Sequence, residues 1–139
     1  MNILKLSALT LSLLSVPVSA QTVQFDIQNI KHDEGKVYVQ LFKGEEDFNN
    51  NIPYNATIVK ARKGSMTVSF SDIEPGDYAI RYFHDENNNG AMDTNLFGLP
   101  VEGFGFSNNA KVNFGPPSFQ QAAFKVAQKT VKNNSTVNY

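Results

Sequence analysis

The sequence predicts an all-β protein, a β-sandwich of about seven strands. Three observations support this fold class. Segments rich in β-branched and aromatic residues recur along residues 23–139, and some alternate strictly between apolar and polar side chains. Turn signals such as Lys63-Gly64 and Pro75-Gly76 separate them. No long amphipathic helical pattern occurs, and such a set of short strands is typical of two packed sheets.

The first twenty residues have the pattern of a secretory signal peptide. Lys5 gives a basic start, residues 6–16 are an apolar run broken only by Ser and Thr, and residues 18–20 are small enough for cleavage. The run is too short to span a membrane. We expect cleavage after Ala20, export to the periplasm or the extracellular space, and a mature chain of 139 − 20 = 119 residues without an integral membrane segment.

Composition narrows the possible partners. The chain holds 12 Lys and Arg against 13 Asp and Glu, so removing Lys5 leaves 11 basic and 13 acidic residues, a net charge of −2. This near balance argues against nucleic acid, which needs a concentrated basic patch. The absence of Cys excludes disulfides and thiolate metal sites. We expect residues 21–139 to form one domain held together by packing, with a metal as a further source of stability.

The expected strands share an excess of β-branched and aromatic residues. The first alternates apolar and polar residues, and the third and fourth look like a hairpin. The strands are expected at residues 23–28, 36–42, 57–62, 65–70, 77–83 and 122–127, with a last strand that ends at residues 137–139.

Two longer connections are expected. Residues 43–56 contain three consecutive asparagines and a proline and are predicted to be a loop. Residues 84–117 show little regular pattern and contain three of the six prolines. Ser118 and Gln121 then have the spacing of a capping box, which predicts one short helical turn.

The second connection begins with HDENNNGAMDTN, residues 84–95, in which oxygen-bearing side chains and one glycine follow the spacing D-x-N-x-N-G-x-x-D. Calcium loops of the EF-hand type take ligands from positions 1, 3, 5, 7, 9 and 12, with glycine at position 6 for a sharp bend. Counted from Asp85, the matching residues are Asn87 (position 3), Asn89 (position 5), Gly90 (position 6), Ala91 (position 7, through its carbonyl) and Asp93 (position 9).

Position 12 departs from the pattern, because Leu96 stands where an EF-hand has a bidentate Glu. Glu102 is the residue we expect to reach back and complete the ligand shell, because glycines flank it at positions 98 and 103. Asn95 or a backbone carbonyl are alternatives. With two carboxylates certain, the predicted calcium affinity is weak, on the order of 10⁻⁴–10⁻³ M.

A polar turn without metal is the simpler interpretation of the same residues. Asn-Gly is a strong turn signal, and Asn and Asp tolerate a left-handed backbone. A turn needs only two such residues, however, and here four stand at liganding spacing. We therefore favour the calcium site over a metal-free scaffold.

The stretch HDENNNGAMDTNLFGLPVEGFGFSNNA, followed by GPPSFQQAAF, resembles the bacterial secreted family named domain of unknown function 2141 (DUF2141), over essentially the whole mature chain. The resemblance brings no established activity. It implies an immunoglobulin-like or transthyretin-like β-sandwich, similar to accessory domains of carboxypeptidases and to the B-type repeats of surface adhesins. Those repeats hold calcium in a similar loop, which implies calcium ligands at Asp85, Asn87, Asn89 and Asp93.

An enzyme, or an accessory domain of one, is the rival hypothesis. It would use His84, Asp85 and Glu102 at the mouth of the same loop, and a pair of carboxylates there could act as acid and base as in glycosidases. No nucleophile motif accompanies the histidine. We therefore expect no catalytic residues and a non-enzymatic binding or accessory module of the envelope, with calcium as its cofactor and a protein or glycan as its partner.

Five phenylalanines in the glycine- and proline-rich part of the chain allow two interpretations. They could form an exposed platform for a sugar or a peptide, or fold inward as a small second core. We favour the inward arrangement because several exposed Phe side chains promote aggregation. The five are Phe97, Phe104, Phe106, Phe114 and Phe119.

Overall fold

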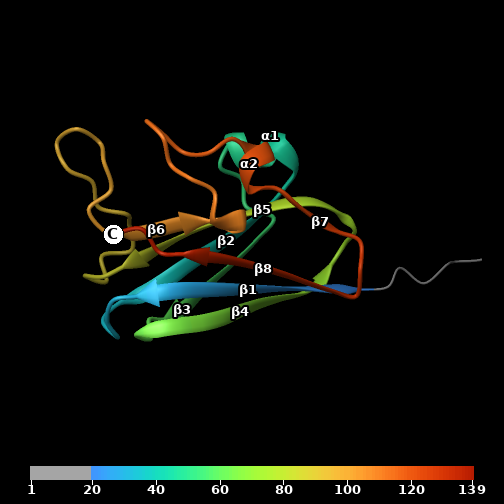
Figure 1. The fold of residues 1–139 in the computed structure, drawn as a ribbon, viewed down its shortest axis with the longest axis horizontal. Helices are drawn as coiled ribbons and strands as arrows, with labels where there is room; N and C mark the ends of the chain where they lie inside the picture. The colour runs from blue at the N-terminus through green and yellow to red at the C-terminus, as the bar shows by residue number, and fades with distance from the viewer. Residues whose placement is uncertain (1–19) are drawn as a thin grey trace, which may run out of the picture.

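Residues 20–139 are described by a computed structural model, in which eight strands form two sheets packed face to face (Figure 1). The all-β sandwich predicted from the sequence is confirmed. The strands are β1 (Gln21–Ile30), β2 (Lys36–Lys43), β3 (Asn55–Lys60), β4 (Gly64–Ile73), β5 (Gly76–Asp85), β6 (Gly103–Phe106), β7 (Phe124–Val126) and β8 (Thr130–Thr136). The short helices are α1 (Gly44–Asn49), the 3₁₀ helix η1 (Ser107–Asn109) and α2 (Phe119–Ala122).

One sheet has the order β4-β1-β8, with β1 antiparallel to β4 and parallel to β8. The other has the order β3-β2-β5-β6, all antiparallel, and β7 pairs with the other half of the same edge of β5. Strand β5 therefore lies centrally in the larger sheet. The long connection with the polar sequence leaves from its C-terminal end.

The main core lies between the sheets and follows from the alternation along the strands. Val23, Phe25 and Ile27 of β1 are buried while the residues between them are only half-buried. Phe25 meets Tyr82 of β5 edge to face at 5.6 Å between ring centroids. The buried Tyr82 hydroxyl donates to Ser135 Oγ at 2.9 Å, so this polar group is satisfied inside the core.

A second cluster covers the outer face of the larger sheet, where α1 and α2 lie (Figure 1). Its buried members are Phe42, Phe48, Ala79, Phe106, Phe119 and Ala122. The predicted capping box is confirmed, because the Ser118 side chain accepts from the Gln121 backbone N–H and the Gln121 side chain accepts from the Ser118 N–H.

Four sequence predictions about elements were wrong. Residues 84–117 were expected to be a connection without regular structure, and they contain β6 and η1. The predicted loop 43–56 contains α1, whose Phe48 packs on Phe42 at 5.5 Å and whose first turn carries three acidic residues that favour a helix N-terminus. The predicted hairpin does not pair, since β3 joins β2 in one sheet and β4 joins β1 in the other. The last strand, β8, ends at Thr136, before residues 137–139.

The expected signal peptide, residues 1–20, lies outside the described residues except for Ala20. Within residues 20–139, no helix has the length and apolar character needed to cross a bilayer.

Candidate metal-binding end of the sandwich

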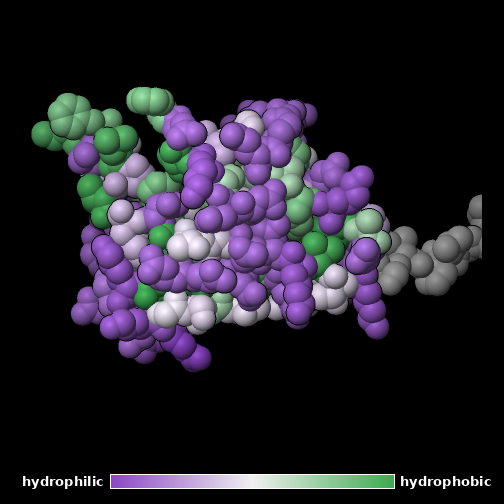
Figure 2. All heavy atoms as spheres, viewed as in Figure 1, coloured by the Kyte–Doolittle hydropathy of each residue, from purple (hydrophilic) through white to green (hydrophobic). Residues whose placement is uncertain are grey.

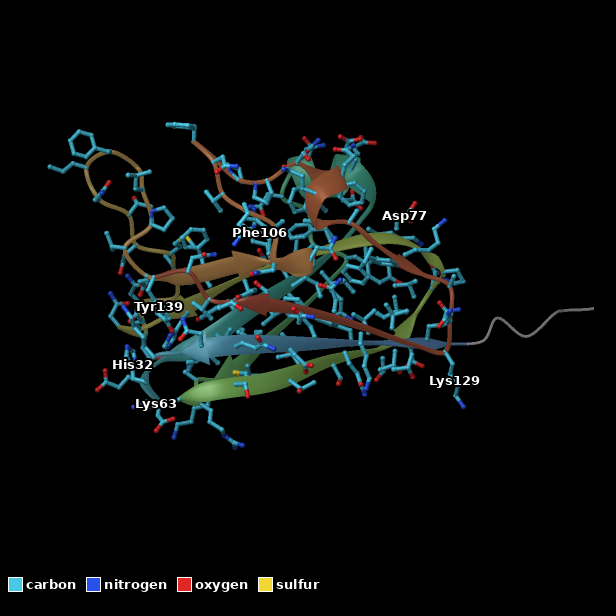
Figure 3. The ribbon with its side chains drawn as sticks, viewed as in Figure 1. His32, Lys63, Asp77, Phe106, Lys129 and Tyr139 are labelled. Atoms are coloured by element: carbon cyan, nitrogen blue, oxygen red, sulfur yellow. The ribbon has the colours of Figure 1, made fainter. Side chains whose placement is uncertain are left out.

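The predicted site residues lie at one end of the sandwich. Three segments meet there: the β1–β2 turn, the loop that links β5 to β6, and the residues after β8. Figure 3 shows His32 and Tyr139 at this end and Asp77 and Lys129 at the opposite end. The antiparallel register of β2 and β5, with Lys36 opposite Asp85, brings the first two segments together.

Asp85 is the buried anchor of the polar loop. Asp85 is the last residue of β5 and is 1% exposed. Oδ1 accepts the backbone N–H of Asn89 at 3.1 Å, and Oδ2 accepts that of Gly90 at 2.9 Å. Gly90 has φ +80, a left-handed conformation that glycine adopts at little cost. The loop therefore curls around the carboxylate.

The same loop is held by further hydrogen bonds from Asn87, Asn89 and Asp93. The Oδ1 atoms of the two asparagines accept the backbone N–H groups of Asn89 (3.2 Å) and Ala91 (3.0 Å). Their Nδ2 atoms donate to the Asp93 carboxylate at 2.5 and 2.8 Å. The four predicted side-chain ligands thus gather in one hydrogen-bonded network. Each amide oxygen accepts one bond and keeps a second lone pair free for a cation.

Glu102 lies at the base of this loop, as a buried carboxylate. Oε1 accepts the backbone N–H of Glu86 at 2.9 Å and Oε2 accepts that of Asp93 at 3.0 Å. The side chain therefore fastens the beginning of the loop to Asp93. Leu96, at the position of the missing EF-hand ligand, is fully exposed at the loop tip. Asn95 shapes that tip, because its Oδ1 accepts the N–H groups of the residues at 97 and 99.

The His84 side chain lies on the face of the sheet opposite to that of Asp85, because consecutive residues of a strand point to opposite faces. It is fully buried, its Nε2 lies 2.6 Å from the Glu34 carbonyl oxygen, and its Nδ1 lies 2.8 Å from the Tyr139 hydroxyl. A carbonyl only accepts, so Nε2 carries the proton. The side chains of His84, Asp85 and Glu102 therefore have separate partners and do not converge on one reacting centre.

Tyr139 completes the environment of His84. Its hydroxyl accepts the Lys31 backbone N–H at 3.0 Å and is free to donate to His84 Nδ1. Burial raises the pKa of the Tyr139 hydroxyl above its ordinary value, so it stays protonated. Gly103 makes room for the ring, since a Cβ there would lie 2.4 Å from it.

His32, in the β1–β2 turn, is a neighbour of His84 that no sequence spacing indicated. The two ring centroids are 4.9 Å apart. His32 Nε2 lies 2.8 Å from Glu86 Oε1, and the other Glu86 oxygen accepts the Gly103 backbone N–H at 3.3 Å. Only the strand register, with Val37 opposite His84, places the turn at this position.

Comparison with known proteins agrees with the resemblance noted in the sequence. A family model described as "Uncharacterized protein conserved in bacteria (DUF2141)" matches residues 25–134, which is most of the chain. The chain belongs to the DUF2141 family. The matched region runs from β1 into β8 and contains the polar loop, His32 and His84. No curated protein and no solved structure matches this chain.

Two loops of this DUF2141 chain, residues 94–101 and residues 110–117, project from the molecule (Figure 1). Figure 2 shows hydrophobic side chains gathered on two protrusions at this end. Leu96 and Phe114 are fully exposed and Phe97 is 88% exposed. The expectation that all five phenylalanines fold inward was thus wrong for Phe97 and Phe114. It is borne out for Phe106 and Phe119, which are buried; Phe104 is half-buried and packs against them.

An apolar cleft of about 270 Å³ lies at the base of these protrusions. Its floor comes from β5 and β6, and its walls come from the two loops. The lining residues include Tyr82, Met92, Leu99, Pro100, Phe104 and Val112. Exposed tips next to an apolar cleft are typical of a surface that contacts another molecule.

Proposed function

We propose that this DUF2141 chain is an exported, non-enzymatic β-sandwich that binds calcium structurally and serves as a binding or accessory module of the envelope. The observation that carries the proposal is the gathering of Asp85, Asn87, Asn89 and Asp93 in a single curled loop. Calcium is a hard cation that prefers carboxylate, amide and carbonyl oxygens. The Ala91 carbonyl and Glu102 complete the proposed ligand set.

The charges of this loop support a cation. Asp85, Asp93 and Glu102 are three carboxylates of one loop, and two of them are buried, although their oxygens do not all lie within 4.8 Å of one another in the described residues. Among residues 20–139, none of the three forms a salt bridge with a Lys or Arg. Buried carboxylates are ordinarily paired with a cation or bound to a metal. Calcium would supply that charge and take over the two amide contacts that Asp93 now accepts.

The role of the calcium would be to fix the base of the projecting loop. A ligand that binds only the folded state stabilises that state by mass action. Residues 94–101 leave this base and carry Leu96 and Phe97 at their tip. An ordered base would present these apolar side chains, with the neighbouring Phe114, to a protein or glycan partner. The separate partners of His84 and Asp85 support a binding role rather than a catalytic one.

A calcium titration tests the proposal. The melting temperature of chelator-treated mature protein is followed as calcium is raised to several millimolar. At tenfold above the Kd, binding adds about 1.4 kcal/mol, which corresponds to a rise of roughly 5 °C for a domain of this size. Asp85→Ala and Asp93→Ala should abolish the rise. Asp77→Ala is the matched control, because Asp77 is exposed at the opposite end (Figure 3).

Two results would overturn the calcium proposal. One is a parent protein whose melting temperature does not change at millimolar calcium. The other is a rise that persists in both Asp85→Ala and Asp93→Ala, which would place the calcium elsewhere. Magnesium serves as a cation control, because its strict octahedral geometry suits this irregular oxygen set poorly.

Export is tested separately by intact mass. The protein is expressed in full in a bacterial host and recovered from the periplasm and the medium. The expected mass is that of a chain beginning at Gln21. Recovery of the uncut chain from the cytoplasm alone would contradict export, and it would leave the calcium measurement unaffected.

A further inference from the structure

A second group of metal-binding side chains lies on the inner side of the same end of the sandwich. His32, His84 and Glu86 each offer a ligand atom, and these atoms lie within 4.8 Å of one another. Among the residues that the structure describes, this is the one such group of three or more His, Asp or Glu side chains. The group combines the β1–β2 turn with the end of β5 and the residue that follows it.

His32 has an unused nitrogen. Its Nε2 contacts Glu86, whereas its Nδ1 is buried and has no hydrogen-bond partner. The nearest acidic atom, Glu34 Oε2, is 3.9 Å away, beyond hydrogen-bonding distance. Buried polar atoms without a partner are rare in folded proteins and call for an explanation. A metal ion bound at this nitrogen of His32 would provide one.

His84 is held as metal-binding histidines usually are. Such a histidine generally donates its second ring N–H to a carboxylate or a backbone carbonyl, which fixes the ring and its tautomer. Here Nε2 donates to the Glu34 carbonyl at 2.6 Å, so the lone pair is on Nδ1. That lone pair meets only the Tyr139 hydroxyl, which also accepts from Lys31 and can give up the contact.

We propose that His32, His84 and Glu86 bind a divalent transition metal ion, with zinc as the ion to test. Two imidazole nitrogens and a carboxylate oxygen suit zinc, nickel or copper, whereas calcium takes oxygen ligands. The side chains of His32 and Glu86 keep 34% and 25% of their surface exposed, so an ion can enter from solvent. The zinc site is separate from the calcium loop and does not depend on it.

The two proposed sites meet at one backbone group. The N–H of Glu86 donates to Glu102, which also holds Asp93. The side chains of these two neighbours nevertheless have separate partners: that of Glu86 contacts His32, whereas that of Asp85 accepts the backbone N–H groups of Asn89 and Gly90. A substitution of one ligand set should therefore leave the other set intact, which makes the two proposals separable by experiment.

Zinc affinity is measured by competition with a chromophoric zinc chelator, in the mature protein with millimolar calcium present. We expect one zinc ion per chain. His32→Ala and Glu86→Gln should each weaken binding at least tenfold. Glu45→Gln is the matched control, because Glu45 is an exposed residue of α1 and is not part of this group. Asp93→Ala should bind zinc as the parent does, whatever happens to calcium.

A second readout does not depend on stability. Cobalt(II) replaces zinc, and its visible absorption reports nitrogen and oxygen coordination. The parent and Glu45→Gln should give the same spectrum, and His32→Gln should lose it while keeping the far-ultraviolet circular dichroism of the parent. Absence of stoichiometric zinc and cobalt binding in the parent would overturn the proposal. Undiminished binding in both His32→Ala and Glu86→Gln would do so as well.

Discussion

Gly35 passes the backbone of Asp85 so closely that a Cβ on Gly35 would lie 2.0 Å from the Asp85 carbonyl oxygen. The contact joins the two candidate sites. The residue before Gly35 supplies the carbonyl that orients His84, and Asp85 begins the loop proposed to bind calcium. The position also has φ +78, so both space and backbone conformation require glycine.

Gly35→Ala should therefore be unusually destabilising. The left-handed backbone alone costs a side chain about 1–2 kcal/mol, and the forced contact with Asp85 adds about 1–3 kcal/mol. Gly44→Ala is the control, since Gly44 has φ +80 and no atom within 4 Å of its would-be Cβ. Denaturant unfolding compares the two variants. Equal losses of unfolding free energy would show that the close approach has no energetic weight.

The buried tyrosines predict a loss of stability at high pH. Burial raises the pKa of the Tyr82 hydroxyl, and that of Tyr78, above the ordinary value of about 10. The folded state thus holds these protons more tightly than the unfolded state. The resulting stabilisation is complete below about pH 10 and is lost as pH rises toward the pKa of the folded state.

Unfolding in denaturant at several pH values between 8 and 11 measures this loss. Tyr82→Phe should flatten the decline above pH 10. At neutral pH it should cost about 1 kcal/mol, because the bond to Ser135 is removed. A decline as steep in Tyr82→Phe as in the parent would assign the effect to other groups.

The phenylalanines should fall into two classes on substitution. Phe106→Ala and Phe119→Ala remove buried rings and should each cost about 3–5 kcal/mol. Phe97→Ser and Phe114→Ser change exposed tips and should alter the unfolding free energy by less than about 0.5 kcal/mol. The same two serine variants should bind a hydrophobic resin less strongly. A large loss of stability in Phe97→Ser would mean that this ring packs against the protein in solution.

The sequence was informative where contacts are local. The D-x-N-x-N-G-x-x-D pattern that begins at Asp85 and the capping box at Ser118 each involve residues close together in the chain. Their spacing alone therefore predicts which groups can meet. The hairpin prediction failed because the turn at residues 61–63 carries the chain from one sheet to the other. A turn signal does not reveal which strands pair. The prediction that Phe97 and Phe114 fold inward failed because composition does not show which loops project from the surface.

The His32 cluster lay beyond any sequence pattern for a related reason. His32 and His84 are far apart in the chain and share no spacing typical of metal ligands. Their contact depends on the register of β2 against β5 and on Gly35, which lets the turn approach the end of β5. The role of Glu102 was predicted only in part. The sequence indicated that its side chain reaches back to the loop, and the structure adds the two backbone N–H groups that it accepts.

Glu102→Gln tests whether this residue binds calcium in addition to holding the backbone N–H groups of Glu86 and Asp93. The amide would turn one N–H donor toward a backbone N–H and should cost about 1–3 kcal/mol without calcium. If Glu102 contributes to the calcium shell, calcium affinity also falls, as we expect. Asn95→Ala is the control, because it loosens the loop tip and leaves the proposed ligands in place. Unchanged calcium affinity in Glu102→Gln would limit Glu102 to holding these two N–H groups.

Tyr139→Phe gives the sharpest test of how His84 binds zinc. The Tyr139 hydroxyl occupies the Nδ1 lone pair of His84 and accepts the Lys31 N–H. Its removal should lower the unfolding free energy by about 0.5–1.5 kcal/mol without metal. It should also raise the zinc affinity severalfold, because zinc no longer competes with the hydroxyl for Nδ1. A severalfold loss of zinc affinity would instead make the hydroxyl a ligand, and an unchanged affinity would mean that zinc does not use Nδ1.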